Sequence, residues 1–321
     1  MPQRAPAMAI ADGAAASLAD WRQDIVAGLT APEKRLSPKY LYDERGSELF
    51  DEICELPEYY ATRTELALLR AHSDELASLA GARAEVVEIG AGSSLKASLL
   101  LESLIEPASY LPVDISAAYL ARQAAEVAAA FPAVAVHAVL ADFTRPLRLP
   151  RQLVREQTVA FFPGSTIGNL SRIRAAALLA SLAERVGGAL LLGVDVCRDP
   201  AILRPAYNDS RGVTAAFNMN LLTRLNRELD ANFELDAFEH HAVYDAAHAR
   251  IEMRLVSRRE QVVTVAGAKV TFRAGEHIVT EHSHKYAPLE VTTMARASGW
   301  DLRRYWIDDD ARFGVFFFRA A

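Results

Sequence analysis

The sequence has few cysteines and no excess of basic residues. Only Cys54 and Cys197 occur among 321 residues, far apart and in no metal-ligand spacing. This excludes a disulfide scaffold and a cysteine-based zinc site, and it suits a reducing compartment. The formal net charge is −6, which argues against nucleic acid as a partner. We therefore expect the partner to be a small molecule.

Long apolar runs are also missing. No stretch has the length and apolar character of a membrane-spanning helix. Residues 1–17 are small and alanine-rich and lack the apolar core of a signal peptide. We therefore expect a flexible tail over 1–17, no membrane partner and a cytoplasmic protein. Hydrophobic residues make up 51% of the chain, enough for a large core and for two domains or one domain with a large insertion.

The most informative stretch runs from Val86 to Lys96. A short apolar run ends at Ile89, Gly90 and Gly92 follow, and a helix is predicted to begin after Ser93. The glycines let the backbone approach a ligand closely, and the helix start offers free N–H groups. The third glycine of a full dinucleotide fingerprint is missing. The loop alone therefore predicts an adenosine-type cofactor, leaves NAD and S-adenosylmethionine open, and is also compatible with an ordinary strand–helix turn.

Strands and helices alternate from this loop onward. The predicted strands cover 85–89, 108–116, 134–140, 157–162 and 189–196, and the predicted helices cover 95–104, 117–130 and 172–186. Such alternation favours a parallel, doubly wound sheet. Ligands bind such sheets at the carboxyl ends of the strands.

Polar residues stand at these strand ends. Asp114 ends the second predicted strand, where an acid accepts hydrogen bonds from ribose hydroxyls. Asp142 and Phe143 end the third, where an acid can bind the amino edge of adenine and an aromatic ring can cover its face. Asp195 ends the fifth, and the sequence leaves a catalytic and a structural role open for it.

The pattern changes after Cys197. A helix is predicted over 211–229, and strands over 238–244, 250–258, 260–265 and 269–272 look like an antiparallel insertion. A helix over 289–298 and strands over 300–307 and 312–319 then end the chain. A terminal hairpin on a five-stranded parallel core is typical of S-adenosylmethionine-dependent methyltransferases and not of nicotinamide dehydrogenases, so it favours methyl transfer.

The region before the glycine loop is predicted to be helical over 18–29, 47–53 and 62–79. Tyrosines cluster at 40–42 and 59–60, where packing at the rim of a core is the alternative to a role in a site.

Together these segments resemble the histidine-specific Nα-methyltransferases of ergothioneine biosynthesis, from about Ser37 to the C-terminus. The matching segments are 39–43, 56–63, the glycine loop through Lys96, 112–114, 162–169, 207–209 and the segment around Glu281. The resemblance implies an α/β fold of the class I (Rossmann-like) methyltransferases, a doubly wound sheet with a C-terminal antiparallel hairpin. It also implies a monomer with an α+β substrate-binding domain built from the N-terminal segment and the insertion after the fifth strand. We expect 61–197 with 287–321 to bind the cofactor, and 18–60 with 198–286 to bind the substrate.

The resemblance also implies site residues. The cofactor S-adenosylmethionine is expected at Tyr42, Gly90, Gly92, Ser93, Lys96, Asp114, Asp142 and Phe143. The substrate is expected at Tyr59, Asn169, Tyr207, Met253, Glu281 and Ser283. Catalytic roles are expected for Tyr42, Tyr59 and Asn169, with Tyr60 as the alternative to Tyr59.

The implied reaction is transfer of three methyl groups to the α-amino nitrogen of L-histidine, giving hercynine. If the segment around Glu281 is extended, Glu281 and Ser283 share one face and can address both imidazole nitrogens. His282 and His284 then share the other face, and without a third ligand at metal spacing we expect no metal. Methylation of tryptophan, tyrosine or another amino acid stays open, as does a non-catalytic protein that binds S-adenosylmethionine.

Several residues with a possible functional role also have an ordinary structural interpretation. Met253 in an alternating strand is ordinarily core, Lys96 at a helix start is ordinarily solvated, and His240-His241 is ordinarily a solvated or hydrogen-bonded strand pair. The sequence does not indicate which group takes the proton from the substrate amine.

Overall fold

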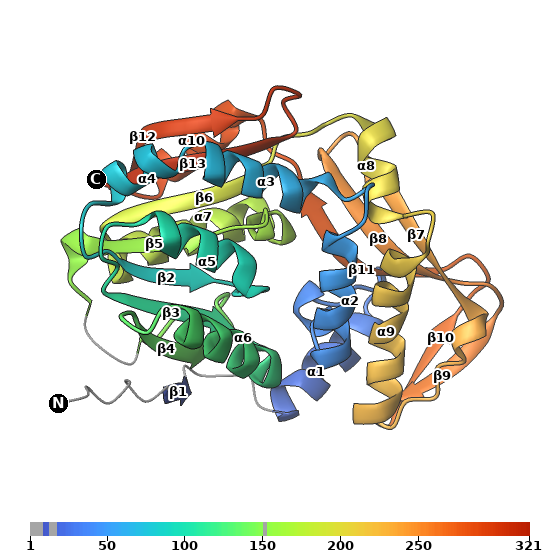
Figure 1. Cartoon of the computed structure of the whole chain (residues 1–321). Helices are drawn as coiled ribbons and strands as arrows, with labels where there is room; N and C mark the ends of the chain where they lie inside the picture. The colour runs from blue at the N-terminus through green and yellow to red at the C-terminus, as the bar shows by residue number, and fades with distance from the viewer. Residues whose placement is uncertain (1–8, 13–17, 150–152) are drawn as a thin grey trace. The chain divides into compact units, whose positions relative to one another are not determined.

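The computed structural model describes residues 9–12, 18–149 and 153–321. The chain separates into two compact units, and each unit is built from segments distant in sequence (Figure 1). Unit 1 comprises 1–15, 61–197 and 286–321, and unit 2 comprises 16–60 and 198–285.

Unit 1 is built on one large sheet. In the described part of the chain this sheet has eight strands in the order β1-β4-β3-β2-β5-β6-β13-β12 (Figure 1). Their bounds are β1 Ala9–Asp12, β2 Glu85–Ile89, β3 Ser109–Asp114, β4 Ala135–Leu140, β5 Thr158–Phe162, β6 Ala189–Asp195, β12 Trp300–Ile307 and β13 Phe313–Ala320. Neighbours from β1 to β6 pair in parallel, whereas β13 is antiparallel to both β6 and β12. This order confirms the predicted class I methyltransferase fold with its C-terminal hairpin.

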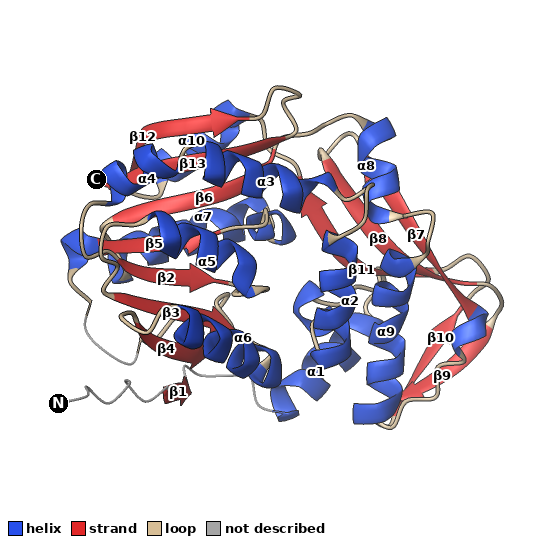
Figure 2. Ribbon diagram, viewed as in Figure 1, coloured by secondary structure: helices blue, strands red, loops and turns tan. Residues whose placement is uncertain are grey.

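Helices cover both faces of this sheet, with α5 and α6 on one face and α7 and α10 on the other (Figure 2). The helices of unit 1 are α3 Tyr60–Ala71, α4 Ser73–Ala80, α5 Ser94–Ser103, α6 Ala117–Ala130, α7 Arg172–Arg185 and α10 Pro288–Ala297. All five residues of β2 and of β5 are buried, including Glu85 and Glu88 of β2. The core on the α7 side contains Phe162, Leu179 and Trp300, each contributing roughly 1.5–3 kcal/mol by leaving water.

The single helix expected over 62–79 is two helices. The break lies at His72, between α3 and α4, and the His72 ring stacks on Trp306 of β12 with ring centroids 5.1 Å apart. Because Trp306 is distant in sequence, its contact with His72 leaves no local sign of the break, and the apolar residues keep a helical spacing across residue 72.

The tail expected over 1–17 is not entirely a tail. Residues 9–12 form β1, which pairs in parallel with β4 from Ala9 opposite His137 to Asp12 opposite Leu140. The remainder of that expectation lies outside the described residues. Without β1, β4 would end the sheet with unpaired backbone groups, which readily accept an extended segment.

Unit 2 combines helices with antiparallel strands, as the insertion predicted. Its helices are α1 Leu18–Thr30, α2 Glu44–Cys54, α8 Pro200–Tyr207 and α9 Val213–Glu228, with short 3-10 turns at Pro38–Leu41 and Leu235–Ala237. Its strands are β7 Phe238–Asp245, β8 Arg250–Ser257 and β11 His277–His284 in one sheet, and β9 Gln261–Val265 with β10 Ala268–Phe272 in a hairpin. Helix α8 was not predicted, because Pro205 inside it and the polar residues after it indicate a turn.

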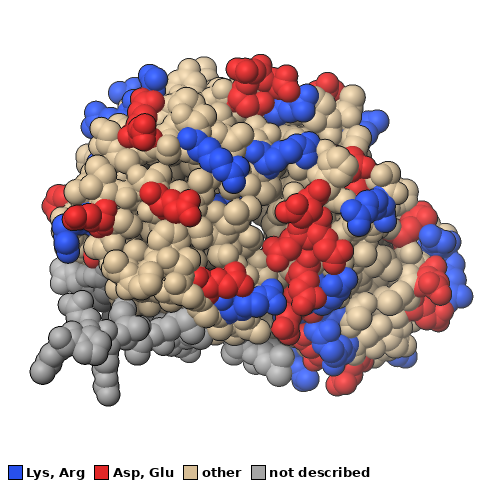
Figure 3. Space-filling view, in the orientation of Figure 1, with Lys and Arg blue, Asp and Glu red and all other residues tan. Residues whose placement is uncertain are grey.

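The surface carries charges of both signs. On the face seen in Figure 3, basic and acidic side chains of the described residues are interspersed, and the largest single-sign group is acidic. None of the described helices is both long and apolar enough to cross a membrane.

Candidate functional site

The loop after β2 leaves open space beside the backbone. Gly90 has φ of +70°, which favours glycine, and its N–H donates to the Val113 carbonyl at 2.9 Å. A Cβ added at Gly92 would meet no atom within 4 Å. Ser93 caps α5 by accepting a hydrogen bond from the Leu95 N–H at 3.3 Å. The loop therefore brings unobstructed backbone to the end of β2.

Acidic and aromatic side chains lie at the ends of β3 and β4. Asp114 accepts a hydrogen bond from the Ser116 N–H at 2.8 Å, and loss of water around it raises its pKa to about 6, so it is ionised at neutral pH. Asp142 is buried and accepts from the Thr144 N–H at 3.0 Å. Phe143 lies edge-on to Phe162 with centroids 5.9 Å apart.

Lys96 forms an ion pair and is not the solvated residue that its position also allowed. Its Nζ lies 2.6 Å from Oε2 of Glu65 on α3, and its side chain is 15% exposed. The same carboxylate accepts a hydrogen bond from the Gly164 N–H at 2.9 Å. Glu65 thus ties the helix after the glycine loop to the loop after β5.

The loop after β5 carries Asn169 and Ser165. Asn169 ends a 3-10 turn over Thr166–Asn169, and its half-buried carboxamide has no hydrogen bond to any residue in the described ranges. Ser165 has φ of +56°, and its Oγ accepts from the Asp195 N–H at 2.9 Å. The Asp195 carboxylate accepts from the Cys197 N–H at 3.0 Å, which favours the structural role left open for Asp195.

In unit 2, aromatic rings gather around Tyr59. Tyr42 lies edge-on to Phe50 and to Phe217, with centroids 5.6 and 5.4 Å apart. Tyr59 lies edge-on to Phe50 at 6.1 Å and to Tyr207 at 6.3 Å. Burial, with Tyr207 nearby, raises the pKa of Tyr59 well above its usual value, so this phenol keeps its proton at neutral pH.

Strand β11 presents Glu281 and Ser283 on one face. Glu281 lies opposite Met253 of β8 and Ser283 opposite Ile251, whereas His282 lies opposite Glu252. This is the division between faces that the alternation predicts. A bulge between Val279 and Glu281 switches the alternation, and it puts Glu281 on the same face as buried Met253.

Glu281 is a buried acid without a hydrogen-bond partner in the described ranges. The residue is 7% exposed, and no described residue donates to its carboxylate. Burial raises the pKa of Glu281 to about 7, an effect that the charge of Lys285 opposes. A buried acceptor of this kind is expected to have a ligand as its partner.

Beside it, three polar groups form a triangle. The Tyr207 hydroxyl and the Ser283 hydroxyl lie 2.7 Å apart. The Lys285 ammonium donates to the Tyr207 oxygen at 2.8 Å and to the Ser283 oxygen at 3.0 Å. The structure therefore joins two of the predicted substrate residues through a buried lysine that the sequence analysis did not single out.

A family model described as "Histidine-specific methyltransferase, SAM-dependent" matches residues 21–320 of the chain. The chain belongs to this family. A histidine N-alpha-methyltransferase of Mycolicibacterium smegmatis is 43% identical over 313 residues, which are 95% of this chain and 95% of that protein. The protein of the same name from Mycobacterium tuberculosis is 42% identical over 302 residues, 92% of this chain and 93% of that protein. Ergothioneine biosynthesis protein 1 of Neurospora crassa is 30% identical over 284 residues, 85% of this chain and 32% of that protein.

Membership in the S-adenosylmethionine-dependent methyltransferases decides between the cofactors that the glycine loop left open. Two charged residues that contact predicted site residues, Glu65 and Lys285, were not singled out from the sequence. Lys285 had a signal, because the alternation that joins Glu281 to Ser283 extends to Lys285. Glu65 had none, since its two partners are distant in sequence.

His240 has structural hydrogen-bond partners at both ring nitrogens. His240 Nε2 lies 2.9 Å from the Tyr207 carbonyl oxygen, and its Nδ1 lies 2.9 Å from the Asn218 amide nitrogen. These distances fit a neutral ring that donates to Tyr207 and accepts from Asn218, and burial lowers the pKa of His240 in agreement. His240 therefore fixes the end of α8, and it is the hydrogen-bonded strand residue that the sequence allowed.

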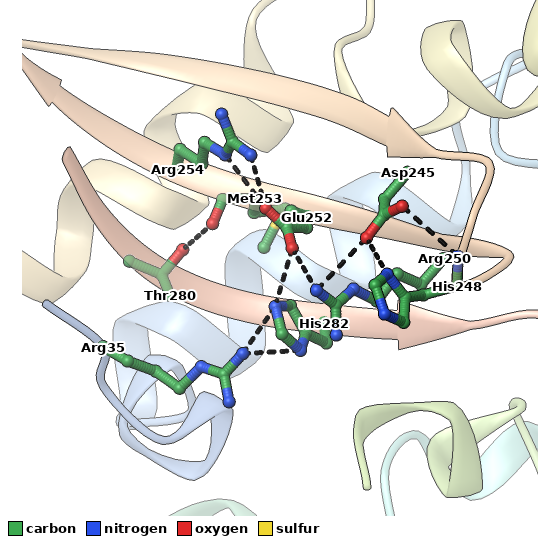
Figure 4. A network of polar contacts seen from close by, with 9 residues as sticks. All are labelled: Arg35, Asp245, His248, Arg250, Glu252, Met253, Arg254, Thr280 and His282. Carbon is green, nitrogen blue, oxygen red and sulfur yellow. Dashed lines mark hydrogen bonds and ion pairs between the residues drawn. The ribbon is translucent and has the colours of Figure 1, made fainter. Parts of the chain in front are cut away.

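On the face of the sheet away from Glu281, His282 belongs to a polar network (Figure 4). Its Nε2 lies 3.1 Å from a Glu252 oxygen and 2.8 Å from Arg35 Nη2. Arg250 and Arg254 each reach Glu252 at 2.6 Å. Within the described ranges no group of three or more His, Cys, Asp or Glu residues could hold a metal ion.

Proposed function

We propose that this methyltransferase transfers three methyl groups from S-adenosylmethionine to the α-amino nitrogen of L-histidine, giving hercynine in ergothioneine biosynthesis. The observation that carries the proposal is the buried Glu281 carboxylate, which has no protein partner in the described ranges and shares a face with the Ser283 hydroxyl. Family membership and the near full-length similarity to histidine N-alpha-methyltransferases support the same substrate.

The residues of unit 1 suit the cofactor. Asp114 is ionised at neutral pH and would accept hydrogen bonds from the ribose, while Asp142 and Phe143 would hold the adenine. The open space at Gly92 and the start of α5 would admit the rest of the cofactor, with Lys96 nearby. When bound, S-adenosylmethionine supplies an activated methyl group on a sulfonium.

The enzyme must then supply a neutral, oriented amine and exclude water. Tyr59 keeps its proton at neutral pH, which favours a role as a hydrogen-bond donor that positions the substrate over a role as a base. The half-buried Asn169 carboxamide has no partner in the described ranges and offers both a donor and an acceptor. We assign Tyr59 and Asn169 to catalysis on this basis, and Tyr42 on the resemblance to the histidine-specific family, with Tyr207 holding the carboxylate.

The imidazole ring explains the selectivity. A neutral imidazole has one N–H donor and one nitrogen acceptor, and a carboxylate with a hydroxyl two residues away complements both. Glu281 would accept from the N–H, Ser283 would serve the other nitrogen, and Met253 would pack near the ring. An amino acid without these nitrogens would leave the buried carboxylate unpaired, which costs several kcal/mol in well-built sites.

The two units would divide this work. We propose that unit 1 binds the cofactor and that unit 2 binds the amino acid, because seven of the eight assigned cofactor residues lie in unit 1, and five of the six assigned substrate residues lie in unit 2. Tyr42 and Asn169 are the exceptions.

We further propose a monomer in the cytoplasm. Neither Cys54 nor Cys197 forms a disulfide within the described residues, which agrees with a reducing compartment. Light scattering during size-exclusion chromatography tests the monomer, and fractionation of the producing cells tests the compartment.

The decisive experiment offers the purified protein S-adenosylmethionine and an equal mixture of the twenty amino acids, with mass spectrometry as the readout. We expect histidine alone to gain three methyl groups. Methylation of tryptophan or tyrosine would overturn the role of Glu281 and Ser283, and cofactor binding without methylation of any amino acid would favour a non-catalytic binder.

A matched variant tests the imidazole pocket. Glu281→Ala is expected to lower histidine turnover far more than binding of S-adenosylhomocysteine, measured by calorimetry. Equal histidine kinetics in the variant and the parent would remove Glu281 from the pocket.

A further inference from the structure

Lys285 is an unusual residue for the interior of a protein. It is fully buried at the end of β11, and its backbone N–H donates to the Ala249 carbonyl at 2.7 Å. Burial of an ammonium is costly unless its donors are paired. Two of these donors are directed to the Tyr207 and Ser283 oxygens, and the Nζ also lies 4.7 Å from the centroid of the Tyr207 ring.

An ammonium can donate hydrogen bonds but cannot accept them, so both hydroxyl oxygens accept from Lys285. The two hydroxyls are also hydrogen bonded to each other at 2.7 Å, which uses the hydrogen of one of them. When Tyr207 donates to Ser283, Ser283 donates outward, and when Ser283 donates to Tyr207, Tyr207 donates outward. In the ligand-free protein, only one of the two hydroxyls can therefore donate outward. A substrate that accepts from both displaces the bond between them, and the Lys285 ammonium then still holds both oxygens.

This coupling matters because the two hydroxyls are assigned to different ends of the substrate. Tyr207 is assigned to the carboxylate and Ser283 to the imidazole. We propose that Lys285 is a positioning and specificity-determining residue that links recognition of the carboxylate to recognition of the ring, an inference that rests on the proposed histidine substrate. It acts through Tyr207 and Ser283 by holding them as one hydrogen-bonded unit.

The charge of Lys285 has a second consequence. It favours the ionised form of Glu281, which burial disfavours. Among the described residues, the titratable groups near the ammonium include Glu281 on β11 and Tyr207 on α8, and the Tyr59 ring lies 6.3 Å from the Tyr207 ring between centroids. Removal of the ammonium therefore raises the pKa of Glu281, so the carboxyl stays protonated up to a higher pH. In the protonated form, it no longer serves as the acceptor for the imidazole N–H.

The test uses the full-length enzyme saturated with S-adenosylhomocysteine, with histidine affinity measured by calorimetry and methylation measured separately. Lys285→Met keeps the length of the side chain and removes its charge and donors. We expect at least about a tenfold loss of histidine affinity and a rise in KM that exceeds the fall in kcat. S-adenosylhomocysteine affinity should stay within about twofold. The acidic limb of the pH profile of kcat/KM should move to higher pH, and Lys285→Arg should move it less.

A double-variant cycle tests the coupling itself. If the three groups act as one unit, Lys285→Met with Ser283→Ala should bind histidine no more than about twofold more weakly than the worse single variant. Lys34→Met is the control, since Lys34 is also a largely buried lysine of unit 2 but pairs with Glu276. Its histidine affinity should match that of the parent within about twofold.

Three results would overturn the inference: independent, multiplying effects of the two substitutions, an unmoved pH profile, or histidine affinity in Lys285→Met within twofold of the parent. Lys285→Met is expected to fold, because an apolar side chain relieves the cost of a buried charge, and cofactor affinity reports folding in each variant. A parent enzyme that does not bind or methylate histidine would refute the proposed function instead, so the two failures are distinguishable.

Discussion

Glu281, which we propose to bind the imidazole, weakens the fold that carries it. Its pKa is about 7 in the folded protein against 4.5 for an ordinary glutamate, because burial disfavours the charge. Between these two pH values the folded state binds more protons than the unfolded state, so stability falls as pH rises. The loss is complete above pH 7 and amounts to about 3 kcal/mol. The buried carboxylate is thus in place for a donor, which the proposed function assigns to the substrate ring.

Glu281→Gln is therefore expected to stabilise the unliganded protein at pH 8, by up to about 3 kcal/mol, and to have little effect near pH 4.5. Thermal unfolding of both proteins at the two pH values measures this. The raised pKa values of Glu88, about 8, and of Asp114, about 6, act alike in both proteins and cancel in the comparison. Exposed Glu260→Gln is the control, and equal melting temperatures of Glu281→Gln and its parent at pH 8 would contradict the buried charge.

Among the elements, helix α9 depends on Asp209, which lies in the turn before its N-cap residue Gly212. Asp209 accepts hydrogen bonds from the N–H groups of Arg211 and Val213, both at 3.0 Å, and of Thr214 at 2.8 Å. These donors belong to the turn and the first residues of the helix, and they also lower the pKa of Asp209. Because Tyr207 ends α8 two residues before Asp209, the turn that Asp209 holds also fixes the end of α8.

Asp209→Ala is expected to lower the free energy of unfolding by about 1–2 kcal/mol, a cost similar to that of losing a side chain that accepts from the N–H groups at a helix start, and to raise KM for histidine. Urea unfolding at pH 7 measures the first effect and steady-state kinetics the second. Asp236→Ala removes an exposed acid of the same unit and should change neither. Unaltered stability of Asp209→Ala would show that its three hydrogen bonds are replaced by water.

At the scale of the whole molecule, both units are discontinuous in sequence. The chain leaves unit 1 after residue 197 and returns at residue 286. The Tyr286 N–H donates to the Asp195 carbonyl at 3.2 Å, so the exit and the return of the chain are neighbours in space. An insertion at such a point can grow without disturbing the sheet that carries it.

A fragment that joins residues 61–197 to 286–321 through a short Gly-Ser linker is therefore expected to fold and to bind S-adenosylhomocysteine. It should not bind histidine. Circular dichroism checks the fold and calorimetry checks both ligands. A folded fragment that binds histidine, or that fails to bind the cofactor product, would contradict the division of roles between the units.

Much of this architecture follows from local sequence. A buried parallel strand is mostly apolar and a half-buried strand alternates, so β2 to β10, β12 and β13 lie within a few residues of their predicted bounds. Strand β1 was predicted as a tail, and β11 was predicted only as a segment that could be extended. The glycine loop and the acids at the ends of β3 and β4 were equally visible, because a strand end, a turn and a helix start follow one another along the chain. The same alternation put Glu281 and Ser283 on one face.

The tertiary structure decided what depends on residues distant in sequence. No local sequence pattern predicts the ion pair of Glu65 with Lys96, the stacking of His72 on Trp306 or the pairing of β1 with β4. The triangle of Tyr207, Ser283 and Lys285 likewise exists only where α8 meets β11. The sequence by itself determined the order of the elements and the chemistry at their ends, since backbone periods and turns are local. Which charges become buried and paired was decided by packing, since burial depends on the whole fold.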